Sequence, residues 1–210
     1  MKLKKKPKMI LIAVITIIVV IAIAFGAVTL AKNLGNDDKV EKAKVLKSID
    51  NYGYHLKDNK DKKYKNMFEE LEKILTKKEV SDEEYVKKIT EMFIYDFYSL
   101  NNKTAKTDVG GVDFILPAGL ENFLVNAEDT YYKYVESNIY GERKQTLPMV
   151  DEITISSATE TEYVYNSKRY DAYEVKATWT YTEEKYASYQ NEATLTFVKD
   201  GINYYLAELQ

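Results

Sequence analysis

The sequence contains no cysteine, and this absence excludes several kinds of site together. Without a thiol there are no disulfide bonds, no thiol nucleophile, no thiolate metal ligands and no lipid attachment through an N-terminal cysteine. The only histidine, His55, has no second histidine or cysteine to join it in a metal or acid–base site. We therefore expect no catalytic constellation, no cofactor and no metal site. An enzyme would have to work with carboxylates and tyrosines alone, and we favour a protein that is not an enzyme.

Basic residues are scarce outside the N-terminal segment. Six of the 30 Lys and Arg residues lie within residues 1–32, whereas all 33 Asp and Glu residues follow, so residues 33–210 carry 24 basic against 33 acidic side chains. The net charge of −9 argues against nucleic acid as a partner, because phosphates require a basic surface. It also argues against a body that lies flat on an anionic membrane surface.

What the sequence does have is one long apolar run. Residues 9–31 are 23 residues without a charge, and a helix of this length covers roughly 34 Å, enough to cross a hydrocarbon core about 30 Å thick. Five lysines precede the run, and a lysine-rich flank stays in the cytoplasm. The alternative is a cleaved signal peptide with a small-residue cleavage site at residues 29–31. The apolar region of a signal peptide, however, is shorter than this run of 23 residues. We expect a cytoplasmic basic stub (1–8), a single transmembrane helix (9–31) in the cell membrane and an extracytoplasmic C-terminal part.

The residues after the apolar run divide into a stalk, 32–57, and a domain, 58–210. Apolar residues at helical spacing predict a short helix over residues 40–49 of the stalk. In the domain, an apolar face predicts a helix over residues 61–78, and Ser81 with Glu84 forms a capping box that begins a second helix reaching about Leu100. The short connection makes these two helices an antiparallel hairpin.

The second half of the domain changes from helical to strand periodicity. Gly110 and Gly111 predict a tight bend before a short strand at 112–116, and a third helix follows over residues 118–137. Residues 150–156 and 162–165 read as a strand pair, and strict alternation around Trp179 predicts a strand with one buried face. Asp200 and Gly201 mark a hairpin turn before the last strand. The expected fold is α+β, with a helical hairpin and a third helix packed on a curved antiparallel sheet of four or five strands.

This order of elements resembles the nuclear-transport-factor-like, cystatin-like cone fold. With the anchor in front, it resembles the bitopic scaffold subunit of type IV secretion machines. Two segments, DFYSLNNK at 96–103 and DVGGV at 108–112, are typical of uncharacterised membrane-anchored proteins of Gram-positive bacteria. The resemblance implies no activity, because cones of this kind include enzymes, ligand carriers and scaffolds.

Two sets of residues are candidates for a cavity or a partner-binding site. Asp96 lies among aromatic residues, and it either points inward, where it must be paired or protonated, or faces solvent on the polar side of its helix. The aromatic side chains Tyr98, Tyr173, Trp179 and Tyr181 either line the mouth of a cavity or form ordinary core. We expect an extracytoplasmic scaffold or protein-interaction domain with envelope protein partners. The alternative is a binding module for a small apolar ligand or an envelope peptide.

Overall fold

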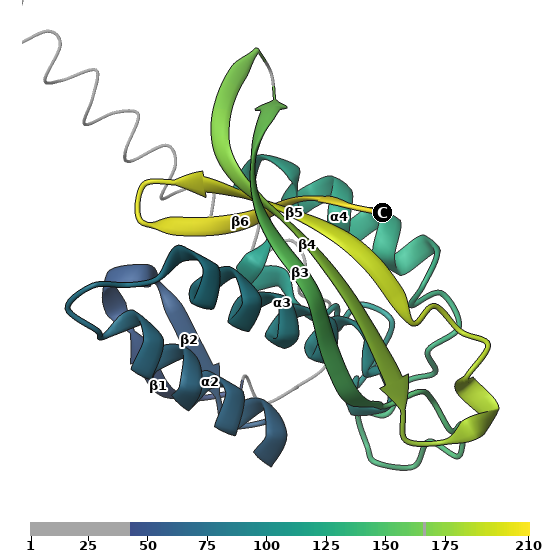
Figure 1. Cartoon of the computed structure of the whole chain (residues 1–210). Coiled ribbons are helices and arrows are strands. Elements are labelled where there is room, and N and C mark those ends of the chain that lie inside the picture. Colours follow the sequence, from purple (N-terminus) through teal and green to yellow (C-terminus); the bar gives the residue numbers. More distant parts are fainter. Residues whose placement is uncertain (1–42, 166) are drawn as a thin grey trace, which may run out of the picture. The chain divides into compact units, whose positions relative to one another are not determined.

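The computed structural model describes residues 43–165 and 167–210, which form a mixed α+β domain (Figure 1). The expected stub and apolar run lie outside the described residues, and within the described ranges no helix is both long and apolar enough to cross a membrane. The main elements are β1 (Val45–Ile49), β2 (Tyr54–Lys57), α2 (Lys62–Leu75), α3 (Asp82–Tyr98), α4 (Leu120–Asp129), β3 (Val150–Tyr165), β4 (Lys168–Tyr181), β5 (Glu192–Asp200) and β6 (Asn203–Leu209).

Helices α2 and α3 form the expected hairpin, and each begins at a side chain that caps it. The Asp61 carboxylate accepts a hydrogen bond from the Tyr64 amide at 2.9 Å, and the Ser81 hydroxyl accepts one from the Glu84 amide at 3.2 Å. Helix α2 buries one apolar stripe, whereas α3 is buried on most of its surface from Tyr85 onward. Helix α3 is therefore the central element of the core.

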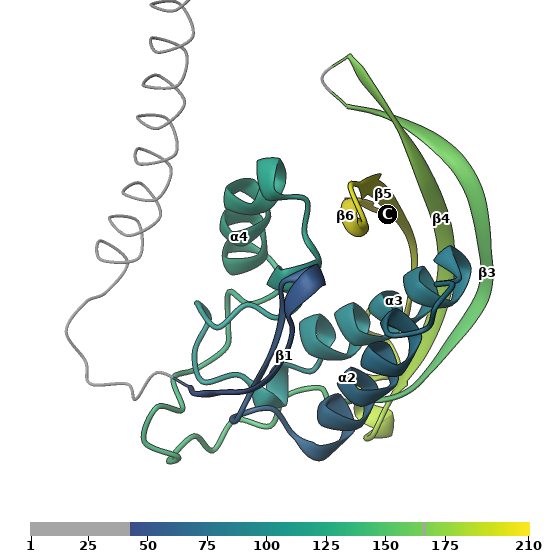
Figure 2. The same cartoon turned by 90° about the vertical axis from the view of Figure 1, so that its left-hand side faces the viewer.

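Strands β3, β4, β5 and β6 form one antiparallel sheet in chain order, and the sheet curves around α3 (Figure 2). Its inner face carries the large buried side chains of β4, β5 and β6, among them Val175, Trp179, Leu195, Phe197 and Tyr204. The register places Tyr173 opposite Phe197 and Val175 opposite Leu195. The expected alternation of buried and exposed positions in β4 is confirmed.

The stalk prediction is wrong over residues 45–49, which form strand β1 instead of the end of a helix. Gly53 adopts a left-handed conformation (φ 70°) and turns the chain, so that β1 pairs with β2. The spacing of Val45 to Ile49 fits one helical turn as well as it fits a short strand. The pairing with β2 decides between them.

Three further boundaries differ from the prediction. Val112–Phe114 is a single 3-10 turn, and the only strand-like pairing nearby is a parallel bridge from Ile115 to Leu206. Helix α4 stops at Asp129 and a turn follows. Residues 150–165 form one long strand, β3, which pairs with β4 along its length and has an irregularity between Ile155 and Ser157.

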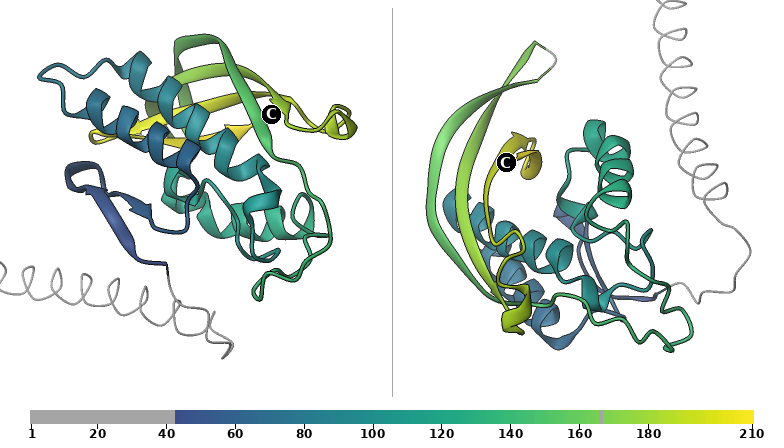
Figure 3. Two further views of the ribbon diagram at one scale, coloured as in Figure 1. Left: turned by 90° about the horizontal axis from the view of Figure 1, so that it is seen from below. Right: turned by 90° about the vertical axis from the view of Figure 1, so that its right-hand side faces the viewer.

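Two ends of the domain can be distinguished (Figure 3). The tip of the β3–β4 hairpin lies at one end. The start of β1 and the loop over residues 130–149 lie toward the other end in Figure 2 and in the right-hand view of Figure 3.

Candidate functional site

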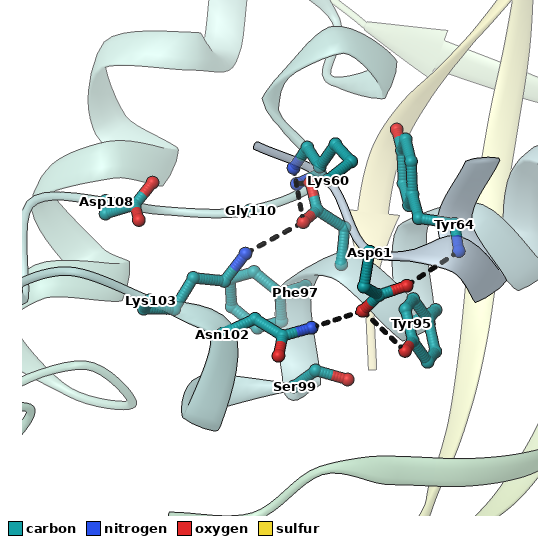
Figure 4. A network of polar contacts seen from close by, with 12 residues as sticks. Lys60, Asp61, Tyr64, Tyr95, Phe97, Ser99, Asn102, Lys103, Asp108 and Gly110 are labelled. Carbon is teal, nitrogen blue, oxygen red and sulfur yellow. Dashed lines mark hydrogen bonds and ion pairs between the residues drawn. The ribbon is translucent and has the colours of Figure 1, made fainter. Parts of the chain in front are cut away.

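Asp96 points inward, and it is the centre of a buried ion cluster (Figure 4). Its Oδ1 atom accepts from the ammonium groups of Lys60 at 2.6 Å and Lys103 at 2.8 Å. Its Oδ2 atom accepts from the Gly111 amide at 2.9 Å. Lys103 is 3% exposed, so this pair is almost completely removed from water. Of the two alternatives for Asp96, the structure shows the inward, paired one.

The lysines decide the protonation state of Asp96. Burial by itself raises the pKa of this carboxyl, but the charges of Lys103 and Lys60, and their hydrogen bonds, outweigh burial and hold the pKa well below its usual range. Asp96 is thus ionised at neutral pH and cannot supply a proton. The geometry is that of a structural clamp and does not fit a general acid.

A second carboxylate, Asp61, lies beside the clamp and extends the network. Besides capping α2, it accepts from the Tyr95 hydroxyl at 2.8 Å and from the Asn102 amide at 2.6 Å. The cavity among these groups has a volume of about 30 Å³, the space of one water molecule. It is too small for an organic ligand.

The glycine pair brings a loop against α3 more closely than any other residue type allows. A Cβ atom at Gly110 would lie 2.1 Å from the Asp96 carbonyl oxygen, and Gly111 has φ +73° with Phe93 at 2.5 Å from a Cβ built there. The Gly110 amide donates to the Tyr132 hydroxyl at 3.1 Å, which donates to the Phe97 carbonyl at 2.6 Å. The predicted tight bend is present, and it places the Gly111 amide on Asp96.

The aromatic candidates divide into two places. Trp179 is 3% exposed, its ring centroid lies 4.4 Å from that of Tyr98, and its indole N–H donates to the Tyr181 hydroxyl at 3.0 Å. Tyr173 instead packs against Tyr204 and donates to Glu160 at 2.8 Å. The row is packed as core, and Asp96 lies in the polar clamp with Lys60 and Lys103.

A feature that sequence reasoning missed is the free edge of β3. It is the outermost strand, so one side of its 16 residues has no strand partner among the described residues. A groove of about 330 Å³ runs between this edge and the helices. Its lining comes from residues 151–154 of β3, from Lys63, Met67 and Glu70 of α2, and from Lys88 and Glu91 of α3.

The direction of the backbone groups follows from the neighbouring pairs. The Trp179 amide donates to the Asn191 carbonyl on the β5 side, and the Thr182 amide donates to the Met149 carbonyl on the β3 side. The backbone amide and carbonyl groups of the even-numbered residues of β4 therefore point toward β3. In an antiparallel pair these positions alternate. The register then leaves the amide and carbonyl groups of Ile153, Ile155, Ala158 and Glu160 directed away from β4. The sequence does not indicate this edge, because the polar residues in the middle of β3 lack an alternating pattern and predict a turn between two strands.

Comparison with known proteins adds nothing to this geometry. No protein-family model, no curated protein and no solved structure matches the chain.

Proposed function

We propose that this protein is a single-pass protein of the cell membrane whose extracytoplasmic domain binds envelope proteins as a scaffold or assembly subunit. The apolar run at residues 9–31 and the five lysines before it support the anchor and its orientation. One observation supports the binding role. It is the free edge of β3 with a groove beside it.

Such an edge is suited to strand addition. An extended segment of a partner pairs with the free amide and carbonyl groups and places alternate side chains in the adjoining groove. Met67 gives the groove an apolar surface. The charges on the helices are paired within the domain, Lys88 with Glu70 and Glu91, and Lys63 donates to the Asp151 carbonyl oxygen. The backbone supplies affinity, and the lining supplies selectivity.

The two places expected to hold a small apolar ligand, around Asp96 and around Trp179, have no room for one, which favours a protein partner. The cavity at Asp96 holds about 30 Å³, and the Trp179 ring is packed against Tyr98. Binding pockets for drug-sized ligands have about 300 Å³ or more and enclose the ligand. The β3 groove reaches that volume but is an open channel at a sheet edge, as an extended peptide requires.

The test is crosslinking in intact cells with two variants at one position. Ala158→Pro removes an amide on the free side of β3, which the pairing with β4 does not use, whereas Ala158→Ser keeps it. Both variants are recovered by pulldown of the full chain, and their folding is compared through Trp179 fluorescence. We expect membrane and envelope proteins to accompany the wild type and Ala158→Ser, and to be lost from a folded Ala158→Pro.

Two outcomes contradict the proposal. Partners that remain at the wild-type level in a folded Ala158→Pro variant contradict binding at the edge. A chain recovered alone, or only with itself, contradicts the scaffold role.

A further inference from the structure

Large apolar side chains are exposed at the end of the domain where β1 begins. Tyr134 is 76% exposed and Tyr140 is 80% exposed, and Ile139 lies next to Tyr140 in the same loop. Val45 and Leu46 at the start of β1 are also more than half exposed. Three large exposed apolar residues within seven positions of one loop are more than the scattered apolar positions of an ordinary surface.

The loop that carries the two tyrosines is held in place from both sides. The Arg143 guanidinium donates to the carbonyl oxygens of Asn101 and Lys103 at 2.9 and 2.8 Å. The Gln145 side chain donates to the Tyr134 carbonyl at 2.8 Å and accepts from the Glu136 amide at 3.0 Å. Because this loop is braced, the exposure of its apolar side chains is a feature of the folded state.

A chain of contacts joins this loop to the start of the domain. The amide of Lys44 donates to the Asp58 carboxylate at 3.0 Å, and the Asp58 amide donates back to the Lys44 carbonyl at 2.8 Å. Lys60, two residues later, shares Asp96 with Lys103, whose carbonyl binds Arg143. The ion cluster thus lies between the segment that leads to β2 and the segment that binds the loop, and the loop and the start of β1 lie toward the same end in Figure 2.

The charge of this end differs from that of the whole domain. Lys133, Arg143 and Lys144 outnumber Glu136 and Glu142 in the loop over residues 130–147, although acidic residues predominate in the body. The general negative charge argues against adsorption over a broad face. It does not oppose contact through this one loop.

We infer that this end of the domain docks on the surface of the lipid bilayer, with Tyr134, Ile139 and Tyr140 in the headgroup region. The inference rests on the proposed membrane anchor. Only 11 residues, 32–42, separate the apolar run from Ala43, and their full extension is at most about 40 Å. The tether joins the domain where β1 begins, so this end can reach the membrane.

The chemistry of these side chains fits a lipid interface. Tyrosine combines an apolar ring with a hydroxyl that stays hydrated, and it is enriched where hydrocarbon meets water. Lys133 and Lys144 beside the rings attract anionic headgroups. The far half of β3 leads to the hairpin tip, which lies at the opposite end and away from this loop.

The absence of cysteine makes a direct test simple. Ser137→Cys places a single thiol beside the exposed side chains, and Val164→Cys places one near the hairpin tip, where Val164 is 61% exposed. Each full-length variant is labelled with an environment-sensitive dye and reconstituted in vesicles of phosphatidylcholine and phosphatidylglycerol. Flotation measures membrane attachment, and spin-labelled lipids measure contact through quenching of the dye.

We expect both variants to float with the vesicles, and we expect quenching at position 137 but not at position 164. Adding Ile139→Ser and Tyr140→Ser should reduce quenching at position 137 to the level at position 164. Ile202→Ser, which removes an apolar side chain that is 55% exposed at the β5–β6 turn, should leave it unchanged.

The outcomes separate the docking from the anchor on which it rests. A protein that floats without quenching at position 137 overturns the docking and leaves the anchor intact. A dye at position 137 that is shielded from water but not quenched by lipid indicates a protein contact and overturns the docking too. A protein that does not float overturns the anchor and, with it, this inference.

Discussion

Replacing Asp96 by asparagine tests whether the buried ion cluster holds the fold together. The change keeps the shape of the side chain but removes the charge that neutralises Lys103, whose ammonium lies 2.8 Å away and is 3% exposed. Lys60, at 2.6 Å, loses the same partner. The variant therefore leaves an uncompensated positive charge inside the domain.

The expected cost follows from that burial. Removing one partner of a buried ion pair typically destabilises a protein by about 3–5 kcal/mol. For a domain of this size each kcal/mol lowers Tm by about 2–4 °C, so Asp96→Asn should lower Tm by roughly 6–20 °C. Glu162→Gln is the matched control, because Glu162 pairs with Arg169 on the surface, where ion pairs contribute little.

The pH dependence provides a second measure of the same cluster. The folded pKa of Asp96 is depressed below its ordinary value near 3.8. Its contribution to stability is therefore complete above that ordinary value and is lost as the pH falls through the lower, folded pKa. We expect Asp96→Asn to lack this part of the acid sensitivity of the wild type.

The assay is unfolding followed by the fluorescence of Trp179, the only tryptophan, which lies in the core. Full-length protein in detergent is compared at neutral pH and across the acid range. An Asp96→Asn variant with the midpoint of the wild type, or a Glu162→Gln variant that loses as much as Asp96→Asn, refutes the role given to the clamp.

Three further predictions concern the core and the glycine pair. Trp179→Ala should cost about 3–5 kcal/mol, because it removes a ring packed against Tyr98, and a variant with normal Tm that lost partner binding would restore the cavity alternative. Gly111→Ala should be destabilising, since its φ is +73° and its Cβ would lie 2.5 Å from Phe93; unchanged thermal unfolding contradicts this. Burial raises the pKa of Tyr54, Tyr64 and Tyr132 well above the ordinary value of 10.0. The stability that these tyrosines contribute is therefore complete below pH 10.0 and is lost as the pH rises toward their folded pKa values. The ionisation of these tyrosines, measured by tyrosinate absorbance, should accompany the loss of native Trp179 fluorescence. Ionisation of the three tyrosines while the protein is still native contradicts their burial.

The sequence predicts those elements whose stabilising contacts are local. Helix α2 follows from one apolar stripe, and α3 from the cap at Ser81. The alternation through Trp179 identifies β4, because one of its faces is buried and the other is wet. In each of these elements a period in the sequence corresponds to a buried face, and the prediction succeeds.

The prediction fails where the spacing of apolar residues does not identify the partner of a segment or a side chain. Strand β1 exists because residues 54–57 pair with it, and the inward direction of Asp96 depends on Lys60, 36 residues earlier in the sequence. The single strand at 150–165 is continuous because β4 pairs with its polar middle. Apolar periodicity indicates a buried face, but it does not identify these partners.

The free edge of β3 has a consequence for solubility. The strand contains Asp151, Glu152, Glu160 and Glu162 and has no lysine, arginine or proline, so negative charge is what keeps the edges of two copies apart. A high salt concentration screens this repulsion while the backbone groups of the edge remain exposed. In a concentrated solution of high ionic strength the protein should therefore associate edge to edge, and the strand offered to a partner becomes the strand through which the protein aggregates.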